Sequence, residues 1–333
     1  MKVDFHFHLE EGPYSYRWLE RTASALEVAA PVDGGNRFDR HTLPWIVDMT
    51  DRLQARLTKG CFSEEWLSAY IRLGRERGIE QFGVVDHLYR FTEFRRYYER
   101  YILLDDSELG VMQRRWLDSV CVGSIRDFIE TVRQLQRQGA PLSLGVEADY
   151  FAGGEAELAE LLSEYEFDYI IGSVHFLDGW GFDNPEAQHV FQQKDLLELY
   201  RYFFEQVKRA ASSGLFDIIA HLDNLKVFNY RPDESRLLQL YDDVARVLKQ
   251  ADVATEINTG LAYRYPVNEM CPSPLFLGKL FEHGVPITLS SDSHFPDDIG
   301  RMLDEAVQLA VKTGYREVVC YRNRKRYAVS LVD

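Results

Sequence analysis

The sequence predicts an α/β fold in which helices alternate with the strands of a parallel sheet, either closed into a barrel or open and doubly wound. Two observations support this prediction. Seven short β-rich runs recur, and most of them are nearly continuously apolar, as expected for strands of a parallel sheet that is buried on both faces. The segments between these runs carry helix start and stop signals, so strand and helix alternate about seven times along the chain.

Each predicted strand is short and ends in polar residues. The seven ranges are 2–8, 81–87, 142–150, 168–176, 217–223, 253–260 and 286–294. In the first of them, "KVDFHFH", histidine alternates with phenylalanine. Side chains of a strand alternate between its two faces, so His6 and His8 are predicted on one face. Phe5 and Phe7 are then expected together on the other face, packed against the helices.

The predicted helices begin at capping residues and end at glycines. Ser63 opens the segment 63–78, and Ser124 opens the segment 124–139. Further helices are predicted at 155–164, 194–213, 234–250, 274–283 and 298–313.

Two connections between strands are longer than one helical crossover requires. We interpret parts of 20–60 and of 88–122 as insertions over the mouth of the barrel. The stretch "RFTEFRRYYERYILL" in the second insertion fits a lid, but a solvated amphipathic helix is favoured. No linker composition or repeat divides the chain, which predicts a single domain over residues 1–333.

The formal charge of -15, from 53 acidic and 38 basic residues, argues against sequence-independent binding to nucleic acid. The four cysteines are far apart and form no C-x-x-C pair, which fits a reducing compartment. No apolar run reaches the roughly 20 residues that span a bilayer, and the first residues are too polar for a signal peptide. We therefore expect a cytoplasmic protein that contacts neither membranes nor nucleic acid. Its oligomeric state stays open.

Six of the nine histidines lie at the carboxyl ends of predicted strands, together with two carboxylates. They are His6, His8, His87, His175, His221 and His294, with Glu147 and Asp292. Each of these residues alone is better explained by a structural role, such as a hydrogen bond or a surface position. Their coincidence at several strand ends favours a site, because active sites form at the carboxyl ends of barrel strands.

Imidazoles and carboxylates without thiolates suit Zn²⁺, Fe²⁺ or Mn²⁺. Eight candidate ligands exceed the three or four of one catalytic zinc ion, so more than one ion is predicted. Two ions bridged by a carboxylate are a common device for hydrolysing phosphate esters. The motifs of serine hydrolases, P-loop proteins and Rossmann folds are absent from the sequence.

The strand-end motifs resemble those of the PHP (polymerase and histidinol phosphatase) superfamily, and within it the histidinol-phosphatase branch. The matching motifs are "DFHFH", "VVDH", "GVEADY", "IIGSVHFLDGWGFDNPE", "IIAHLDNLK", "EINTG" and "LSSDSH". They run in the family's order from residue 4 to residue 294. The resemblance implies a distorted (β/α)7 TIM-like barrel with the insertions over its carboxyl-terminal rim.

The resemblance also implies two to three divalent ions, of Zn, Fe or Mn. The first ion would be held by His6, His8, Glu147 and Asp292. The second, to which Glu147 bridges, would be held by His175 and His221. The third would rest on His87 and His294. The implied catalytic residues are Glu147, Asp292 and His175, around a metal-bridging hydroxide that attacks phosphorus.

The chain departs from the family pattern at Tyr14, where family members often carry a further histidine for the third ion. Either Glu10 or Glu11 replaces that histidine as an oxygen ligand, or the third site is weak or empty. Lys226 and Arg264 follow strand ends and are candidates to bind the substrate phosphate, although a surface role is equally open. The candidates to face the cationic part of the substrate are Asp178 and Trp180.

We expect a metal-dependent phosphomonoesterase that hydrolyses L-histidinol phosphate to L-histidinol and phosphate, a step of histidine biosynthesis. The first alternative is a PHP phosphoesterase that acts on another phosphomonoester or on a nucleotide. The second is a non-catalytic, metal-stabilised domain that binds a partner through residues 20–60. The complete set of two-metal ligands argues against this second alternative.

Overall fold

Seven parallel strands form one sheet in the computed structural model, which describes residues 1–29 and 38–332. The strands follow one another in the order β1-β2-β3-β4-β7-β8-β9. Their bounds are Lys2–Phe7 (β1), Ile79–Val84 (β2), Leu142–Asp149 (β3), Tyr169–Ser173 (β4), Ile218–Ile219 (β7), Ala254–Asn258 (β8) and Ile287–Ser290 (β9). Each of the seven predicted strands is confirmed.

The two outer strands of the sheet come together, which nearly closes it into a barrel. The backbone N–H of Asp292, after β9, donates to the carbonyl of His6 at 2.9 Å. The N–H of His8 donates in turn to the carbonyl of Ser293 at 2.8 Å. A barrel of seven strands is therefore confirmed over an open sheet.

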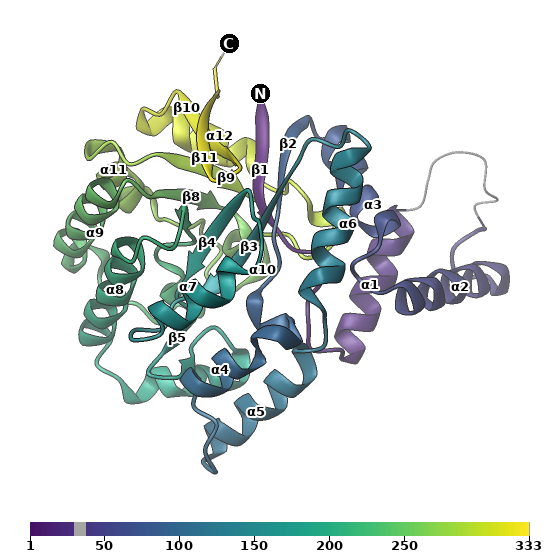
Figure 1. The fold of residues 1–333 in the computed structure, drawn as a ribbon, viewed down its shortest axis with the longest axis horizontal. Coiled ribbons are helices and arrows are strands. Elements are labelled where there is room, and N and C mark those ends of the chain that lie inside the picture. The colour runs from purple at the N-terminus through teal and green to yellow at the C-terminus, as the bar shows by residue number, and fades with distance from the viewer. Residues whose placement is uncertain (30–37, 333) are drawn as a thin grey trace.

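Seven helices that the sequence predicted surround the barrel (Figure 1). They are α3 (Glu64–Glu76), α6 (Ile125–Arg137), α7 (Glu155–Ser163), α8 (Leu196–Ser212), α9 (Leu238–Ala251), α11 (Pro274–Glu282) and α12 (Leu303–Thr313). Ser63 caps α3 as predicted, because its hydroxyl accepts from the N–H of Trp66 at 3.4 Å. The apolar stripes of these helices cover the outer face of the sheet.

A hairpin that the sequence did not predict lies at the amino-terminal end of the barrel, beside the N-terminus (Figure 1). It consists of β10 (Glu317–Arg322) and β11 (Lys325–Ser330). The hydroxyl of Ser143 in β3 donates to the carbonyl of Tyr321 at 2.8 Å. This contact ties the hairpin to the barrel strands, at the end opposite to the polar strand ends.

Strand β1 does not keep the strict alternation that its sequence predicts. Its pairing with β2 is irregular between Asp4 and Phe7, and such a bulge interrupts the alternation of faces. Phe5 packs inside the barrel, 4.7 Å from the ring of Tyr169, which also lies over Gly145. Phe7 packs outside, 5.2 Å from Tyr70 of α3. The prediction that both phenylalanines share one face is therefore wrong, whereas His6 and His8 do point to one site.

The predicted 20–60 insertion forms two helices on the flank of the barrel (Figure 1). They are α1 (Tyr16–Ala29) and α2 (Leu43–Lys59); residues 30–37 lie outside the described part of the chain. Trp18 of α1 and Arg56 of α2 reach the rim, where both donate to the Glu10 carboxylate.

The predicted 88–122 insertion lies at the carboxyl ends of the strands, at the bottom of Figure 1. It contains η1 (Leu88–Arg90), η2 (Thr92–Phe94), α4 (Arg95–Tyr101) and α5 (Glu108–Val120). Helix α4 is amphipathic as expected, because Arg96, Glu99 and Arg100 are exposed while Tyr97 and Tyr98 are buried. The Tyr98 hydroxyl donates to a carboxylate oxygen of Asp149 at the end of β3, at 2.8 Å. This insertion is thus part of the wall around the strand ends.

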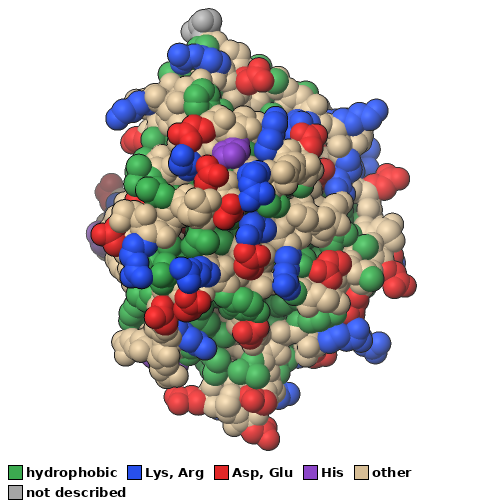
Figure 2. Space-filling view, turned by 90° about the vertical axis from the view of Figure 1, so that its left-hand side faces the viewer, with side chains coloured by type: hydrophobic (Ala, Val, Ile, Leu, Met, Phe, Trp, Pro, Cys, Tyr) green, Lys and Arg blue, Asp and Glu red, His purple; other side chains and the backbone are tan. Residues whose placement is uncertain are grey.

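Short elements complete the rim of the barrel. They are β5 (Phe176–Leu177), β6 (Trp180–Gly181), η3 (Pro185–Gln193), η4 (Asn224–Lys226), η5 (Glu234–Arg236), α10 (Gly260–Arg264) and η6 (Pro296–Asp298). On the face over α8, α9 and α11, basic side chains are interspersed with acidic ones (Figure 2). Among the described residues, no helix combines the length and apolarity needed to cross a membrane.

Candidate metal centre

All eight residues that the sequence singled out at strand ends come together at the carboxyl end of the barrel. They lie near the end of a strand or directly after it: β1 (His6, His8), β2 (His87), β3 (Glu147), β4 (His175), β7 (His221) and β9 (Asp292, His294). All eight side chains are buried. Parallel strands direct their carboxyl ends to one edge of a sheet, which explains how residues so far apart in sequence converge.

Glu147 lies between two groups of histidines. One carboxylate oxygen, Oε2, is 2.8 Å from His87 Nδ1 and 3.3 Å from the Nε2 atoms of His6 and His8. The other oxygen, Oε1, is 3.1 Å from His221 Nε2 and also accepts from the hydroxyl of Ser173. A carboxylate that offers one oxygen to each of two nitrogen clusters has the geometry of a bridging ligand.

The first group consists of His6, His8 and Asp292, whose donor atoms lie within 4.8 Å of one another. The Nε2 atoms of His6 and His8 are 3.0 Å apart, and Asp292 Oδ1 is 3.4 Å from His8 Nε2. On the other side of Glu147, the Nε2 atoms of His175 and His221 are 3.2 Å apart. Each side of Glu147 can therefore hold one ion between two imidazoles and a carboxylate.

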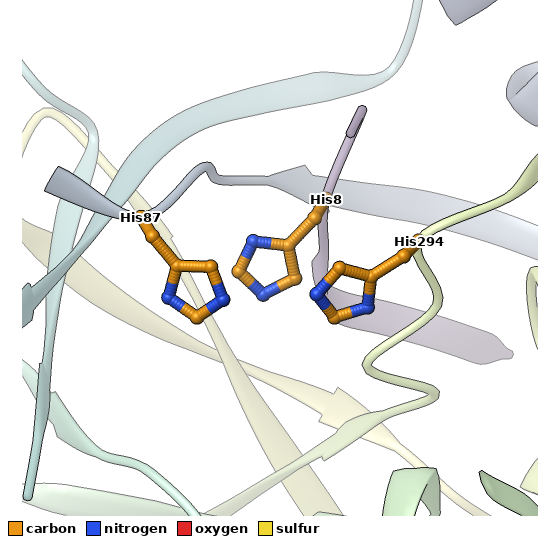
Figure 3. Close-up of side chains that lie close together, drawn as sticks. All are labelled: His8, His87 and His294. Carbon is orange, nitrogen blue, oxygen red and sulfur yellow. The ribbon is translucent and has the colours of Figure 1, made fainter. Parts of the chain in front are cut away.

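A third group consists of His8, His87 and His294 (Figure 3). The ring of His8 lies between the other two, with centroids 4.2 Å from His87 and 4.3 Å from His294. The donor atoms of the three rings again lie within 4.8 Å of one another. The structure thus brings together the two histidines predicted for a third ion and adds His8 to their neighbourhood.

Two carboxylates that sequence reasoning missed fix the orientation of the histidine rings. Glu256 Oε2 lies 3.0 Å from His6 Nδ1, and Asp149 Oδ1 lies 2.8 Å from His175 Nδ1. An ionised carboxylate only accepts, so each Nδ1 carries the hydrogen. Both residues are in the recognised motifs, and Asp149 stands two positions after Glu147, on the same face of a strand.

The resulting set of atoms suits a cation. When Nε2 of His6 or His175 gives up its proton, it offers a lone pair that faces another imidazole and the Glu147 carboxylate. Burial opposes a charge on His175, but Asp149, Asp183 and Glu147 outweigh burial and raise its pKa to about 10. For His8, Asp292, Asp86 and Glu147 likewise outweigh burial and raise the pKa to about 9. The site therefore favours positive charge at the positions where ions would lie.

In the third group, the pKa values of His87 and His294 are lowered rather than raised. Burial lowers the pKa of His87 to about 4, in spite of the nearby Glu147 carboxylate. Burial, Arg264 and His8 together hold the pKa of His294 well below its ordinary value. Both imidazoles are therefore neutral near pH 7, which is the form that binds metal ions.

The structure distinguishes the two glutamates that were candidates for the third site. The Glu10 carboxylate is buried and occupied, because it accepts from Arg56 at 2.8 Å and from the indole of Trp18 at 2.9 Å. Glu11 is only half-buried. Burial opposes a charge on Arg264, but Asp292, the neighbouring tyrosines and Glu11 raise its pKa.

The two cations predicted to bind phosphate differ sharply. Arg264 lies against the centre, with Nη2 2.9 Å from Asp292 Oδ2 and Nη1 2.6 Å from His294 Nδ1. Lys226 is buried elsewhere, and its ammonium donates to Asp223 at 2.9 Å, to Glu269 at 2.9 Å and to the carbonyl of Met270 at 2.7 Å. An ammonium has three hydrogens, and all three are taken. The prediction that Lys226 binds phosphate is therefore wrong for this structure.

Neither residue predicted to face the cationic part of a substrate does so. Asp178 is exposed and accepts from the hydroxyl of Tyr202 at 2.5 Å. Trp180 is buried and packs against Phe191, with ring centroids 4.8 Å apart. After this hairpin, the backbone N–H of Phe182 donates to the carbonyl of His175 at 3.1 Å.

A parallel barrel with a buried histidine and carboxylate centre at its carboxyl end defines a class of proteins that hold divalent ions for hydrolysis. A profile of the PHP domain family matches residues 62–260. The chain belongs to this family. The matched range includes His87, Glu147, His175 and His221. The other four residues of the centre lie outside this range but close to these side chains: His6, His8, Asp292 and His294.

Two curated relatives of the chain are named probable histidinol-phosphatases. The chain is 37% identical over 218 residues to a probable histidinol-phosphatase of Deinococcus radiodurans, covering 63% of this chain and 82% of that relative. It is 25% identical over 191 residues to a probable histidinol-phosphatase of Clostridium acetobutylicum, covering 56% and 73%. The crystal structure of a histidinol phosphate phosphatase of Lactococcus lactis, complexed with zinc, L-histidinol and phosphate, shares the fold with a TM-score of 0.63. That match covers 98% of both chains at 18% identity.

Proposed function

We propose that the protein is a metal-dependent phosphomonoesterase that hydrolyses L-histidinol phosphate to L-histidinol and phosphate. The observation that carries this proposal is the position of Glu147, with one oxygen toward each of two histidine groups. The names of the relatives support the substrate, as does the bound L-histidinol and phosphate of the Lactococcus lactis structure.

The proposed centre holds two to three divalent ions of Zn, Fe or Mn, for which imidazole and carboxylate ligands are suited. The first ion would be held by His6, His8, Glu147 and Asp292. The second would be held by Glu147, His175 and His221. The third would be held by His87, His294 and Glu11, because Glu10 is occupied by Arg56 and Trp18. When bound, such ions supply Lewis acidity, which lowers the pKa of water and neutralises phosphoryl oxygens.

The chain itself contributes binding and orientation. Arg264 is the proposed phosphate-binding residue, because its guanidinium lies at the centre and its Nε has no hydrogen-bond partner among the described residues. Glu256 and Asp149 hold the rings of His6 and His175 so that their Nε2 atoms face inward. Glu147, Asp292 and His175 are the proposed catalytic residues, and the wall of the barrel limits access of water.

The proposed function is tested with purified protein whose bound metals are measured first. We expect phosphate release from L-histidinol phosphate that stops on metal removal and returns with Zn, Fe or Mn. A nucleoside monophosphate and single-stranded DNA serve as the other substrates. Efficient release from the nucleotide alone would move the assignment to another phosphomonoester, and no release from any monoester after metal loading would refute the enzyme.

We expect Asp149→Asn to weaken the binding of the second ion by about 10- to 100-fold, the usual cost of losing an outer-shell partner. The reason is that the Asp149 carboxylate holds His175 Nδ1 at 2.8 Å. Titration of metal against a chelator measures the affinity without relying on turnover. Tyr98→Phe removes one donor to Asp149 and should act in the same direction, more weakly.

The matched control for Tyr98→Phe is Tyr101→Phe on the same helix. Its hydroxyl lies 3.3 Å from Glu157 of α7, away from the centre. Metal affinity should not change in this control. Equal metal affinity in Asp149→Asn and in the parent protein would contradict the orienting role of Asp149.

A further inference from the structure

Helix α2 exposes large apolar side chains to solvent. Leu43 is 75% exposed, Ile46 47%, Val47 52% and Leu57 57%. The helix lies beyond α1 at the right-hand edge of Figure 1, so one of its sides faces away from the barrel. No other helix among the described residues exposes as many large apolar side chains. Such a concentration of apolar surface marks an interaction site.

The exposed residues of α2 form one continuous stripe. Side chains three or four positions apart lie on the same face of an α-helix. Steps of four, three, four and three positions lead from Leu43 to Leu57, and Ile46 lies alongside. The residues of this outer stripe are all exposed: Leu43, Ile46, Val47, Thr50, Gln54 and Leu57. None of them is charged, and their spacing is that of the seam between two paired helices.

The inner side of α2 is anchored to the barrel and does not overlap the outer stripe. Met49 and Arg56 on this side are buried. Arg56 donates to the Glu10 carboxylate at 2.8 Å, and its guanidinium lies over the ring of Trp66, 4.7 Å from the centroid. The helix is therefore held in place by one side, while the outer stripe stays accessible to a partner.

The outer stripe is suited to the same stripe of a second copy of the chain. Leu43 and Leu57 stand seven positions on either side of Thr50. A two-fold axis beside Thr50 would set two α2 helices antiparallel and bring Leu43 of one copy level with Leu57 of the other. The Thr50 hydroxyl donates to the carbonyl of Ile46 at 2.8 Å, so it can be buried at the axis without losing a partner. The antiparallel arrangement also places opposite ends of the helix dipoles together.

The size of the outer stripe predicts a weak and reversible pairing. Its four apolar residues expose roughly 400 Å², similar to the largest patch of a typical monomer, which is often functional. A specific interface buries about 600–1,000 Å² on each partner, so the stripe and the polar residues beside it reach the lower end of this range. We expect a dissociation constant on the order of micromolar for such an interface.

We propose that the outer stripe of α2 is the interface of a two-fold symmetric dimer, in which α2 of one copy lies antiparallel to α2 of the other. This dimer goes beyond the proposed function and does not depend on it, because α2 lies on the flank of the barrel and the metal centre at the carboxyl ends of the strands (Figure 1).

Analytical ultracentrifugation of the full chain, at concentrations from below to above micromolar, measures the pairing. We expect the parent protein to shift from monomer to dimer. Val47→Glu should move the midpoint to at least about tenfold higher concentration, because the two-fold axis places the new charge in the interface twice. Val47 is exposed in the single chain, so the variant should keep its fold, which circular dichroism checks. The matched control is Val122→Glu, the same substitution at a valine outside α2 that is 53% exposed, and it should leave the midpoint unchanged.

Cysteine substitutions test the position of the two-fold axis. A residue meets its own copy only near such an axis, so oxidation should form an intermolecular disulfide in Thr50→Cys. Thr58→Cys, exposed on the same helix but eight positions away, should not cross-link. The parent protein gives the background, since three of its cysteines are buried and Cys61 is partly buried.

A parent protein that stays monomeric at every concentration would overturn the proposal and leave the outer stripe to a different partner. Unchanged dimerisation of Val47→Glu would also overturn it, because the interface would then lie elsewhere. Equal cross-linking of the two cysteine variants would exclude a two-fold axis at Thr50 and with it the antiparallel pair.

Discussion

Glu147→Gln is expected to reduce turnover of L-histidinol phosphate by more than about 100-fold, because losing only an outer-shell partner of a metal ligand already costs up to that factor. Glutamine keeps the shape of the side chain and one acceptor oxygen but removes the negative charge. One oxygen of Glu147 faces His6, His8 and His87, and the other faces His221, so both sides of the centre lose a ligand. Steady-state kinetics and metal analysis of the same samples measure the effect.

The fold should survive this substitution, because Glu147 lies at the carboxyl end of β3 while the apolar core packs along the sheet and under the helices. Circular dichroism and thermal unfolding test this point. Glu160→Gln, on the exposed side of α7, is the matched control and should leave turnover and metal content unchanged. Normal turnover of Glu147→Gln with a full complement of metal would refute the bridging role.

The strands and the metal-site histidines could be predicted from the sequence because both depend on local patterns. A strand buried on both faces must be apolar until it ends, so polar residues at its carboxyl end stand out. His175 and His221 were found in this way, and the parallel topology then brings them within 3.2 Å of each other. No information about partners distant in sequence was needed.

The residues that the sequence misjudged are those whose role depends on a distant partner. From the sequence alone, Glu256 is only a residue of a buried strand. Its role depends on the contact with His6, which lies 250 positions away. The sequence predicts that Lys226 is a free cation at a strand end. In the structure its ammonium donates to Glu269. The bulge in β1 could not be predicted either. It arises from the pairing of β1 with β2, and the alternating residues of β1 do not indicate it.

The two insertions differ in how they relate to the centre. The 88–122 insertion supplies Tyr98, which holds Asp149, and Tyr89, which stacks on His87. Helices α1 and α2, which include most of the described 20–60 insertion, touch the rim through Trp18 and Arg56, and both of these residues donate to Glu10. Glu10 precedes Glu11 directly, so α1 and α2 fix the loop that carries the proposed third-site ligand. Both insertions therefore support the rim from outside the barrel.

Lys226→Met is expected to lower the free energy of unfolding by about 3–5 kcal/mol, the typical cost of removing one partner from a buried ion pair. Asp223 is buried, and its Oδ1 has no hydrogen-bond partner among the described residues, so it depends on Lys226 to balance its charge. Glu269 keeps Arg231 at 2.7 Å and is less affected. Chemical denaturation followed by circular dichroism measures the change. Lys279→Met, which removes an exposed pair with Glu282, should have a far smaller effect.

Kinetics of the same variant distinguish the structural role of Lys226 from the phosphate-binding role that its sequence position suggests. At temperatures well below unfolding, KM for L-histidinol phosphate should not change, because all three ammonium hydrogens already have acceptors. A large rise in KM with little loss of stability would restore Lys226 as a phosphate ligand. Addition of Asp223→Asn to Lys226→Met should recover part of the lost stability, since asparagine can still accept from the N–H of Ser273 without leaving a buried charge. The double variant could instead lose more free energy of unfolding than the two single substitutions lose together. That result would show that the cost of Lys226→Met does not come from the unpaired Asp223 carboxylate.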